Sequence, residues 1–310
     1  MLQQDIVSRY KTLDFFARQV VEGFITGRHK SPFHGFSVEF SDYRQYNSGE
    51  STRNIDWHLY GRTDKLFVKQ FEEETNLRCQ VLIDQSTSML FPIENQGNIE
   101  SPNKLTFSVY AAAVIFELLH RQRDAFGLTL FSNTIDRQTP CRSNAVHQRY
   151  LLGLLDELIQ PVKADKRPMR ETSIAPALHL TAEQLHRRSL VVIFTDALMR
   201  PEEEEQVFDA LRHLRHNHHE VIIFHTYDRA REVELSFSDR PHRFIDLESG
   251  RELRLQPSEI AESYRHQMEQ TFSNLQQRAM QYRIDYVPVD IAQGFHQIML
   301  PFLLKRSKAQ

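Results

Sequence analysis

Oxygen-bearing side chains gather in three short segments of this chain. The segment Asp84-Gln85-Ser86-Thr87-Ser88 follows the apolar run CQVLI, and Asp196 follows the apolar run LVVIFT. A threonine, Thr172, lies in a loop that precedes a helical pattern. Two carboxylates and three hydroxyls are hard oxygen donors of the kind that Mg²⁺ or Mn²⁺ prefers. We therefore predict a metal site formed by Asp84, Ser86, Ser88, Thr172 and Asp196.

The spacing of the first segment is informative because alternate side chains on a turn can converge on one point. An Asp followed by Ser at the second and fourth positions arises by chance at roughly 0.04 per chain of this length. Its place directly after an apolar run, with Asp196 after another, strengthens the prediction. The alternative is that Asp84 and Ser86 only form a turn and a helix cap, which favour the same residue types.

From about residue 76 onward, short apolar runs alternate with helical patterns, which predicts a parallel sheet covered by helices on both faces. In such a sheet, ligands bind beyond the carboxyl ends of the strands, where both aspartates are expected. The predicted strands are Leu77–Ile83, Phe126–Phe131, Leu190–Thr195, Val221–Thr226 and Ile284–Val289.

Helix signals lie between these runs. Ser101 with Pro102 is the expected start of a helix whose buried stripe includes Leu105 and Phe116. Pro201 is expected to open another helix, with Glu202 to Glu205 at its positive end. The segments His242–Leu247 and Glu252–Leu255 could pair as a hairpin, and a long amphipathic helix is expected over Ser258–Tyr282.

The first 75 residues follow a different pattern. Apolar residues at helical spacing, from Leu13 to Phe24, predict a helix, and Phe36–Phe40 and Leu66–Phe71 are candidate strands. We therefore divide the chain into an N-terminal helix plus a small β-rich segment (1–75) and a doubly wound, mainly parallel α/β domain (76–310). No linker rich in proline or serine separates the two parts.

Composition narrows the function classes. Lysine plus arginine (38) nearly balance aspartate plus glutamate (41), giving a formal charge of -3, which argues against a nucleic-acid-binding surface. The longest apolar stretch, Tyr110–Phe116, is far shorter than the about 20 residues of a membrane span. The two cysteines are 62 positions apart and form no CxxC pair, which favours a reducing, cytoplasmic location.

Two further groups of residues have a structural and a functional interpretation. The histidines near the end of the Pro201 helix include pairs three residues apart, as a metal site would need, although a favourable position in the helix dipole is the interpretation that we prefer. The only tryptophan, Trp57, is interpreted as a packing anchor, with Arg53 and Asp56 paired beside it. The histidines near the end of the Pro201 helix are His213, His216, His218 and His219.

The oxygen donors of the predicted site resemble the metal-ion-dependent adhesion site of von Willebrand factor A domains. That site combines D-x-S-x-S, a loop threonine and a strand-end aspartate, and all three parts have counterparts here. The resemblance implies a von Willebrand factor A-like, Rossmann-type fold. It also implies an ion bound by the serines and the threonine, with the aspartates acting directly or through water. The threonine loop reads RETSI, without the usual preceding glycines.

The segment Tyr43–Arg62 resembles the signature of the bacterial family catalogued as domain of unknown function 58. It reads YRQYNSGESTRNIDWHLYGR, against Y-R-x-Y-x-x-G-[DE]-x-x-R-x-I-D-W-x-x-x-A-R in the family. Ser48 stands where the family usually has proline, and Gly61 where it has alanine. The signature residues, which could form an interaction surface or a structural unit, are Tyr46, Gly49, Arg53, Asp56, Trp57 and Arg62.

Members of this family resemble partners of MoxR-type AAA+ ATPases. The resemblance implies a non-enzymatic, metal-dependent protein-binding module that serves as an adaptor, with the ATPase or its client as partner. The alternative is a Mg²⁺-dependent phosphohydrolase that uses Asp84 as nucleophile. Such enzymes need a second carboxylate two residues later, where this chain has Ser86, and the sequence contains no Walker-type loop and no HExxH motif. We therefore expect no enzymatic activity.

Overall fold

The chain forms two compact units in a computed structural model, which describes residues 2–26, 40–47, 55–71, 77–160, 173–197 and 201–308. The larger unit comprises Met1–Phe33 and Arg78–Gln310, and the smaller unit comprises His34–Leu77. The first helix therefore belongs to the larger unit, whereas the sequence analysis grouped it with the β-rich segment. No helix among the described residues is long and apolar enough to cross a membrane.

A six-stranded, mainly parallel sheet forms the centre of the larger unit. Its order is β10-β7-β6-β3-β4-β5, and only β5 runs antiparallel to its neighbour. The five predicted strands are confirmed with ends shifted by one residue at most. β3, β4, β6 and β7 are largely buried apolar runs, whereas β10 is partly exposed. The antiparallel edge strand was not predicted. The strands are β3 (Arg78–Asp84), β4 (Ala125–Phe131), β5 (Ile135–Gln138), β6 (Leu190–Thr195), β7 (Glu220–Tyr227) and β10 (Asp285–Asp290).

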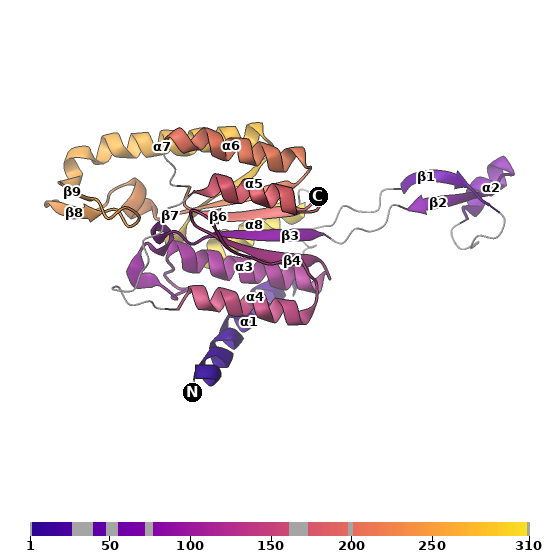
Figure 1. Ribbon diagram of the computed structural model, residues 1–310, viewed down its shortest axis with the longest axis horizontal. Helices are drawn as coiled ribbons and strands as arrows, with labels where there is room; N and C mark the ends of the chain where they lie inside the picture. The colour runs from indigo at the N-terminus through magenta and orange to yellow at the C-terminus, as the bar shows by residue number, and fades with distance from the viewer. Residues whose placement is uncertain are drawn as a thin grey trace. The chain divides into compact units, whose positions relative to one another are not determined.

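Helices cover both faces of this sheet, as the alternating pattern predicted. One layer holds α5, α6 and α7, and the opposite layer holds α1, α3 and α4 (Figure 1). A further helix, α8, follows the last strand and was not predicted. The helices of the larger unit are α1 (Leu2–Thr26), α3 (Lys104–Arg121), α4 (Ala145–Leu158), α5 (Ile174–Gln184), α6 (Pro201–His216), α7 (Pro257–Gln281) and α8 (Phe295–Lys308).

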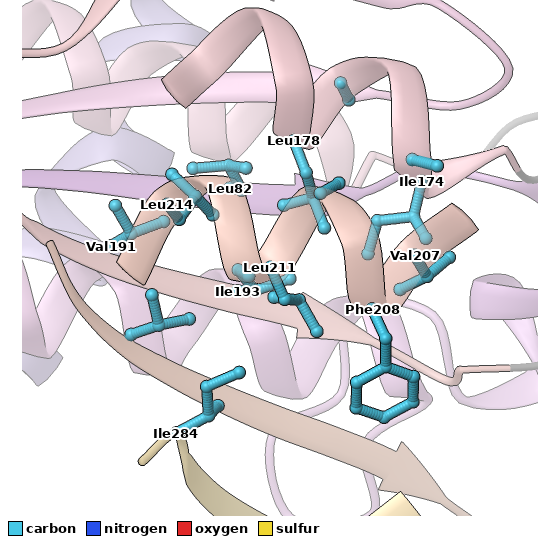
Figure 2. Packing of buried hydrophobic residues seen from close by; sticks show 14 of the residues in the cluster. Leu82, Ile174, Leu178, Val191, Ile193, Val207, Phe208, Leu211, Leu214 and Ile284 are labelled. Atoms are coloured by element: carbon cyan, nitrogen blue, oxygen red, sulfur yellow. The ribbon is translucent and has the colours of Figure 1, made fainter. Parts of the chain in front are cut away.

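The core under α5 and α6 is built from aliphatic side chains at helical and strand periods. Figure 2 shows Leu178 of α5 and Leu211 of α6 over the strand residues Val191 and Ile193. All four side chains are at most 1% exposed. Because burying one such side chain contributes about 1.5–3 kcal/mol, this layer fixes α5 and α6 on the sheet and on each other.

On the opposite face, α1 packs by an apolar stripe that is interleaved with aromatic contacts. The ring of Phe16 meets Tyr110 of α3 at 4.8 Å and Phe295 of α8 at 5.1 Å, both edge to face. Leu13 and Val21 are buried on the same helix. This stripe explains why α1 joins the larger unit: α1 packs mainly against α3 and α4, and Phe295 of α8 lies against Phe16.

Short elements follow the carboxyl ends of the strands. Two 3-10 turns, η2 (Thr87–Leu90) and η3 (Ile93–Asn95), lead from β3 to α3. A π-helical turn, η5 (Arg229–Val233), and the hairpin β8 (His242–Ile245) with β9 (Glu252–Leu255) follow β7. The predicted hairpin and the helix at Pro201 are thus confirmed. A last short turn, η6 (Ile291–Gln293), joins β10 to α8.

The start of α3 corrects one prediction. The cap is Asn103 and not Ser101, because the Asn103 side chain accepts a hydrogen bond of 2.7 Å from the backbone N–H of Thr106. Asparagine is as good a cap as serine, and the presence of Pro102 drew the predicted start two residues too early. The helix therefore begins at Lys104.

The smaller unit is a two-stranded antiparallel sheet with one short helix. Its strands are β1 (Phe40–Gln45) and β2 (Phe67–Phe71), and its helix is α2 (Trp57–Thr63). The second candidate strand is confirmed, whereas most of Phe36–Phe40 lies outside the described residues.

Gly127 of β4 tests how tightly the sheet is packed beneath the carboxyl ends. A Cβ at this position would lie 2.8 Å from the carbonyl oxygen of Thr139 and would also meet the Gln80 side chain. We expect Gly127→Ala to lower the free energy of unfolding by about 1–3 kcal/mol, because the Thr139 backbone cannot move aside freely. Urea unfolding followed by circular dichroism measures the change.

Gly153→Ala in α4 is the matched control. Nothing lies within 4 Å of a Cβ at Gly153, and alanine is the better helix former by about 0.5–1 kcal/mol. The control should therefore be neutral or stabilising. Equal stability of the two variants would contradict the close packing of β4 against its neighbours.

Candidate functional site at the carboxyl ends of two central strands

The topology of the sheet places the two predicted aspartates together. Strands β3 and β6 are neighbours, but β3 is followed by a connection to β4 on one side and β6 by a connection to β7 on the other. A crevice forms where neighbouring connections leave in opposite directions, and ligands bind there in open α/β sheets. Asp84 ends β3, and Asp196 follows β6 directly. The sequence prediction that these residues share one edge of the sheet is confirmed.

The carboxylate of Asp84 is buried and accepts hydrogen bonds from neutral groups. Its Oδ1 accepts from the backbone N–H of Ser86 at 2.8 Å, and its Oδ2 accepts from the Thr195 hydroxyl at 2.9 Å. The side chain is fully buried. Burial, and secondly the nearby charge of Asp196, raise the pKa of Asp84 to about 7. A cation beside Asp84 would offset both effects.

The two serine hydroxyls converge as the spacing predicted. Ser86 Oγ and Ser88 Oγ lie 3.0 Å apart within hydrogen-bonding distance, and both residues are buried. Two oxygens bound at about 2.1 Å on adjacent octahedral positions of Mg²⁺ would be about 3.0 Å apart. The Asp84 carboxylate, at the start of the same turn, adds a charged oxygen. These residues therefore fit a small, hard divalent ion.

Asp196 has a different partner, which the sequence analysis missed. The ammonium of Lys104 lies 2.8 Å from Asp196 Oδ2 and 2.6 Å from Glu232 Oε1. Lys104 is the first residue of α3 and is fully buried. Burial opposes its charge, but the two carboxylates outweigh that effect and raise its pKa. The ammonium is therefore a permanent cation on the Asp196 side of the site.

A signal for this lysine was present in the sequence. Lys104 is followed by twelve uncharged residues, up to Phe116, in a helix that the sequence analysis took to have one buried stripe. All residues of α3 from Lys104 to Leu119 are buried. A single charge at the start of a helix that is buried on every side must find a counter-charge inside the protein, because unpaired burial is too costly.

Glu232 extends the charged group to the segment after β7. Its second oxygen, Oε2, accepts a hydrogen bond of 2.7 Å from the backbone N–H of Asp228. Burial raises the pKa of Glu232, although Lys104 acts in the opposite direction. With Asp84, Asp196 and Glu232 ionised, the three carboxylates exceed the one ammonium by two negative charges. That excess is what one divalent ion would neutralise.

The fifth predicted donor, Thr172, lies outside the described residues. Its neighbour Ser173 caps the start of α5, and the Ser173 backbone N–H donates to the carbonyl of Ser132 at 3.1 Å. Ser132 follows β4 at the carboxyl end of the sheet. The loop that carries Thr172 therefore ends beside the same edge of the sheet as Asp84.

No cluster of three or more His, Cys, Asp or Glu side chains able to hold a metal ion occurs within the described ranges. The candidate set contains only two such side chains, since its other donors are hydroxyls. Asp84 ends β3, Ser86 and Ser88 lie on the turn that follows, and Asp196 follows the neighbouring strand β6. Lys104 is bound to Asp196.

The signature residues belong to the smaller unit, where two have defined roles. Asp56 caps α2, because its Oδ1 accepts from the backbone N–H groups of His58 and Leu59 at 3.0 and 3.1 Å. Tyr46 donates its backbone N–H to Leu66 at 2.9 Å. Gly49 and Arg53 lie outside the described residues, and the charged side chain of Arg62 is in the last turn of α2.

Trp57 departs from the packing-anchor interpretation. Its side chain is 61% exposed and meets the Tyr60 ring edge to face at 6.2 Å. Trp57 is the first residue of α2 and is exposed, whereas its neighbour Ile55 is buried.

The fold and the buried carboxylates define a mainly parallel α/β protein with a candidate ion-binding site at the switch point of its sheet. The family model "Protein of unknown function DUF58" matches residues 42–278. The chain belongs to this family, which confirms the resemblance drawn from Tyr43–Arg62.

The sequence relatives of this chain carry names that state no activity. "Uncharacterized protein Mb1516" of Mycobacterium bovis and "Uncharacterized protein Rv1480" of Mycobacterium tuberculosis are each 26% identical over 248 residues, covering 76% of this chain and 70% of the relative. Among solved structures, the conserved hypothetical protein BatB from Bacteroides thetaiotaomicron has 14% identity, a TM-score of 0.44 and coverage of 75% of this chain and 99% of BatB.

An aerotolerance-related membrane protein from Bacteroides fragilis has 14% identity and a TM-score of 0.45, over 76% of this chain and 100% of that protein. Structural likenesses this weak carry no conclusion about function.

Lys104→Met tests the buried ion pairs. The substitution keeps the length of the side chain but leaves two carboxylates facing each other without their cation. We expect it to lower the free energy of unfolding by about 3–5 kcal/mol. Glu94→Gln is the control, because it removes the partner of Arg231 from a pair in which the side chains are 39% and 62% exposed, worth at most about 1 kcal/mol. Urea unfolding compares them, and similar losses would contradict the central place of Lys104.

Proposed function

We propose that the crevice at the ends of β3 and β6 is a metal-dependent protein-recognition site that holds Mg²⁺ or Mn²⁺. The observation that carries this proposal is the pair of serine hydroxyls 3.0 Å apart beside the fully buried carboxylate of Asp84. Asp196 and, from the loop before α5, Thr172 complete the proposed set. The proposed set is the one that the sequence resemblance to the adhesion site of von Willebrand factor A domains implies.

The donor set explains why such a site would suit recognition. Hydroxyl ligands carry no charge, so an ion held largely by them keeps much of its positive charge. When bound, the ion would supply an electrophilic centre for an acidic side chain of a partner protein. The chain's own contribution is to orient the hydroxyls through the turn that Asp84 closes with the Ser86 N–H.

The proposed partner is a MoxR-type AAA+ ATPase or one of its clients, with this protein as a cytoplasmic adaptor in protein remodelling or maturation. Support for the partner comes from family membership alone. The balanced charge of the chain is compatible with a local, ion-centred contact in place of a broad charged surface.

Lys104 favours a second candidate, in which the site needs no metal. Its ammonium already binds Asp196 and Glu232, so a lysine could take the place of the ion as the cation of the crevice. The two candidates differ in one respect that can be measured: only the first makes the stability of the folded protein depend on a divalent ion.

Thermal unfolding with Mg²⁺, Mn²⁺, Ca²⁺ or EDTA separates these candidates. We expect Mg²⁺ or Mn²⁺ to raise the unfolding midpoint of the wild-type protein, because the ion binds only the folded state. Asp84→Asn should abolish the rise, since it removes the charged donor while keeping its shape. Glu94→Gln should respond as the wild type does.

Lys104→Met sharpens this test. Removing the ammonium adds negative charge to the crevice, so a larger Mg²⁺-dependent rise is expected if ion and lysine share the site. A wild-type midpoint that Mg²⁺ and Mn²⁺ leave unchanged, together with a rise in Lys104→Met, would support the metal-free candidate and contradict the first.

Retention of the ATPase tests the recognition itself. We expect a MoxR-type ATPase from the source organism to bind the immobilised chain in Mg²⁺, and to be released by EDTA. Asp84→Asn should lose the interaction and Glu94→Gln should keep it. Binding that is indifferent to EDTA would exclude the ion as the point of contact.

The enzyme alternative has a separate readout. A phosphohydrolase that used Asp84 would release phosphate from an aryl phosphate in a metal-dependent way, and Asp84→Asn would abolish that release. The recognition proposal expects no such release.

A further inference from the structure

Two histidines from different helices meet on the outer side of the α5–α6 layer. His179 Nδ1 of α5 and His213 Nδ1 of α6 lie 3.4 Å apart. Their ring centroids are 5.7 Å apart, with the planes at 45°. The sequence analysis considered His213 only with its neighbours on the same helix. The partner of His213 in the structure is 34 positions away and can be found only from the packing of the two helices.

The distance between the two nitrogens suits a shared ion. Zinc binds histidine nitrogen at about 2.0–2.1 Å and prefers tetrahedral angles, so two nitrogens about 3.4 Å apart subtend about 110° at the metal. A hydrogen bond between two imidazoles would be long at this separation, since N–H bonds usually span about 2.7–3.2 Å. The spacing thus fits a bridging ion better than it fits a direct bond.

The two side chains are also held on rigid supports. Leu178 precedes His179, Leu214 follows His213, and both leucines are fully buried in the layer between the helices and the sheet (Figure 2). His179 lies in the middle of α5 and His213 in the last turn of α6, and each is next to a fully buried leucine, so core packing sets the separation of the two imidazoles. Sites built on helices are more exact than sites built on loops.

The geometry points to a two-histidine site for a transition-metal ion, Zn²⁺, Ni²⁺ or Cu²⁺, bridging α5 and α6. Imidazole nitrogen selects these ions over Mg²⁺ and Ca²⁺, which prefer oxygen. No third His, Cys, Asp or Glu completes a cluster in the parts of the chain that the structure describes, and among those parts water would supply the further ligands of a bound ion. The site is therefore open and exchangeable, and it is independent of the oxygen site at the strand ends.

A bound ion would tie together the helices that lead away from that oxygen site. Helix α5 follows the loop of Thr172, and α6 follows the segment after Asp196. An ion on both histidines binds only the folded arrangement of the helices, so it must raise the unfolding midpoint.

The test is a titration of the full-length, untagged chain with Ni²⁺ and with Zn²⁺ near pH 7.5, where imidazole is mostly neutral. Isothermal calorimetry gives the affinity, and thermal unfolding gives the shift. With excess Mg²⁺ present to occupy the proposed oxygen site, we expect one transition-metal ion per chain and a higher midpoint. His179→Gln should weaken binding by at least about tenfold, which is the lower end of the loss when even an outer-shell partner of a metal is removed.

Two further variants make the result specific. His216→Gln, three residues from His213 on the same helix, should bind Ni²⁺ as the wild type does, and Asp84→Asn should leave Ni²⁺ binding unchanged. If His179→Gln binds as tightly as the wild type while His216→Gln does not, the ion uses histidines of α6 alone and the proposal is overturned. Absence of binding to the folded wild-type protein would overturn it as well.

Discussion

The arrangement at the carboxyl ends of the strands depends on one buried cation, the ammonium of Lys104, held between Asp196 and Glu232. It joins the start of α3 to the end of β6 and to the turn η5. Asp196 and Glu232 are 92 and 128 positions after Lys104 in the chain. A buried ion pair adds little net stability compared with an apolar replacement, but removing one partner is expensive. The pairs therefore act mainly by permitting only the arrangement in which all three charges meet.

This constraint divides the crevice into two halves of different character. Near Asp196, the ammonium neutralises negative charge at hydrogen-bonding distance. Near Asp84, the donors are a backbone N–H and a hydroxyl, and burial together with Asp196 raises the pKa of Asp84 to about 7. Among the described residues, the Asp84 carboxylate therefore has only neutral hydrogen-bond donors, and it lies on the side of the site where the hydroxyls of Ser86 and Ser88 converge. A second cation would be most stabilised on that side.

Sequence patterns were sufficient where local rules and burial agree. The five parallel strands are apolar runs with no competing interpretation, and the positions of Asp84 and Asp196 follow because they end two of those runs. The convergence of Ser86 and Ser88 follows from their spacing on a turn. The start of α3 was wrong because Ser101, Pro102 and Asn103 offer overlapping start signals, and propensity alone does not rank them.

Other features depend on contacts between segments far apart in the sequence. The partners of Lys104 and the meeting of His179 with His213 arise from the order of the strands and from how α5 packs against α6. The edge strand β5 is short, with exposed polar residues, and shows no apolar run. Helix α8 contains Pro301, a residue that argues against a helix interior in any reading of sequence alone.

The proposed oxygen site lies at the ends of β3 and β6 and the histidine pair lies on α5 and α6, so the two share no ligand and differ in ligand chemistry. Imidazole nitrogen does not suit Mg²⁺, so Mg²⁺ would occupy only the proposed oxygen site and would not compete for the histidine pair. Any coupling between them would pass through the packing of α5 and α6, where Leu178 and Leu214 are fully buried. Coupling is reciprocal: an ion on the histidines that changed the affinity for Mg²⁺ by some factor would have its own affinity changed by the same factor. A stiff layer with one packing arrangement transmits no such change, and only a second arrangement of the helices, favoured unequally by the two ions, would link the sites.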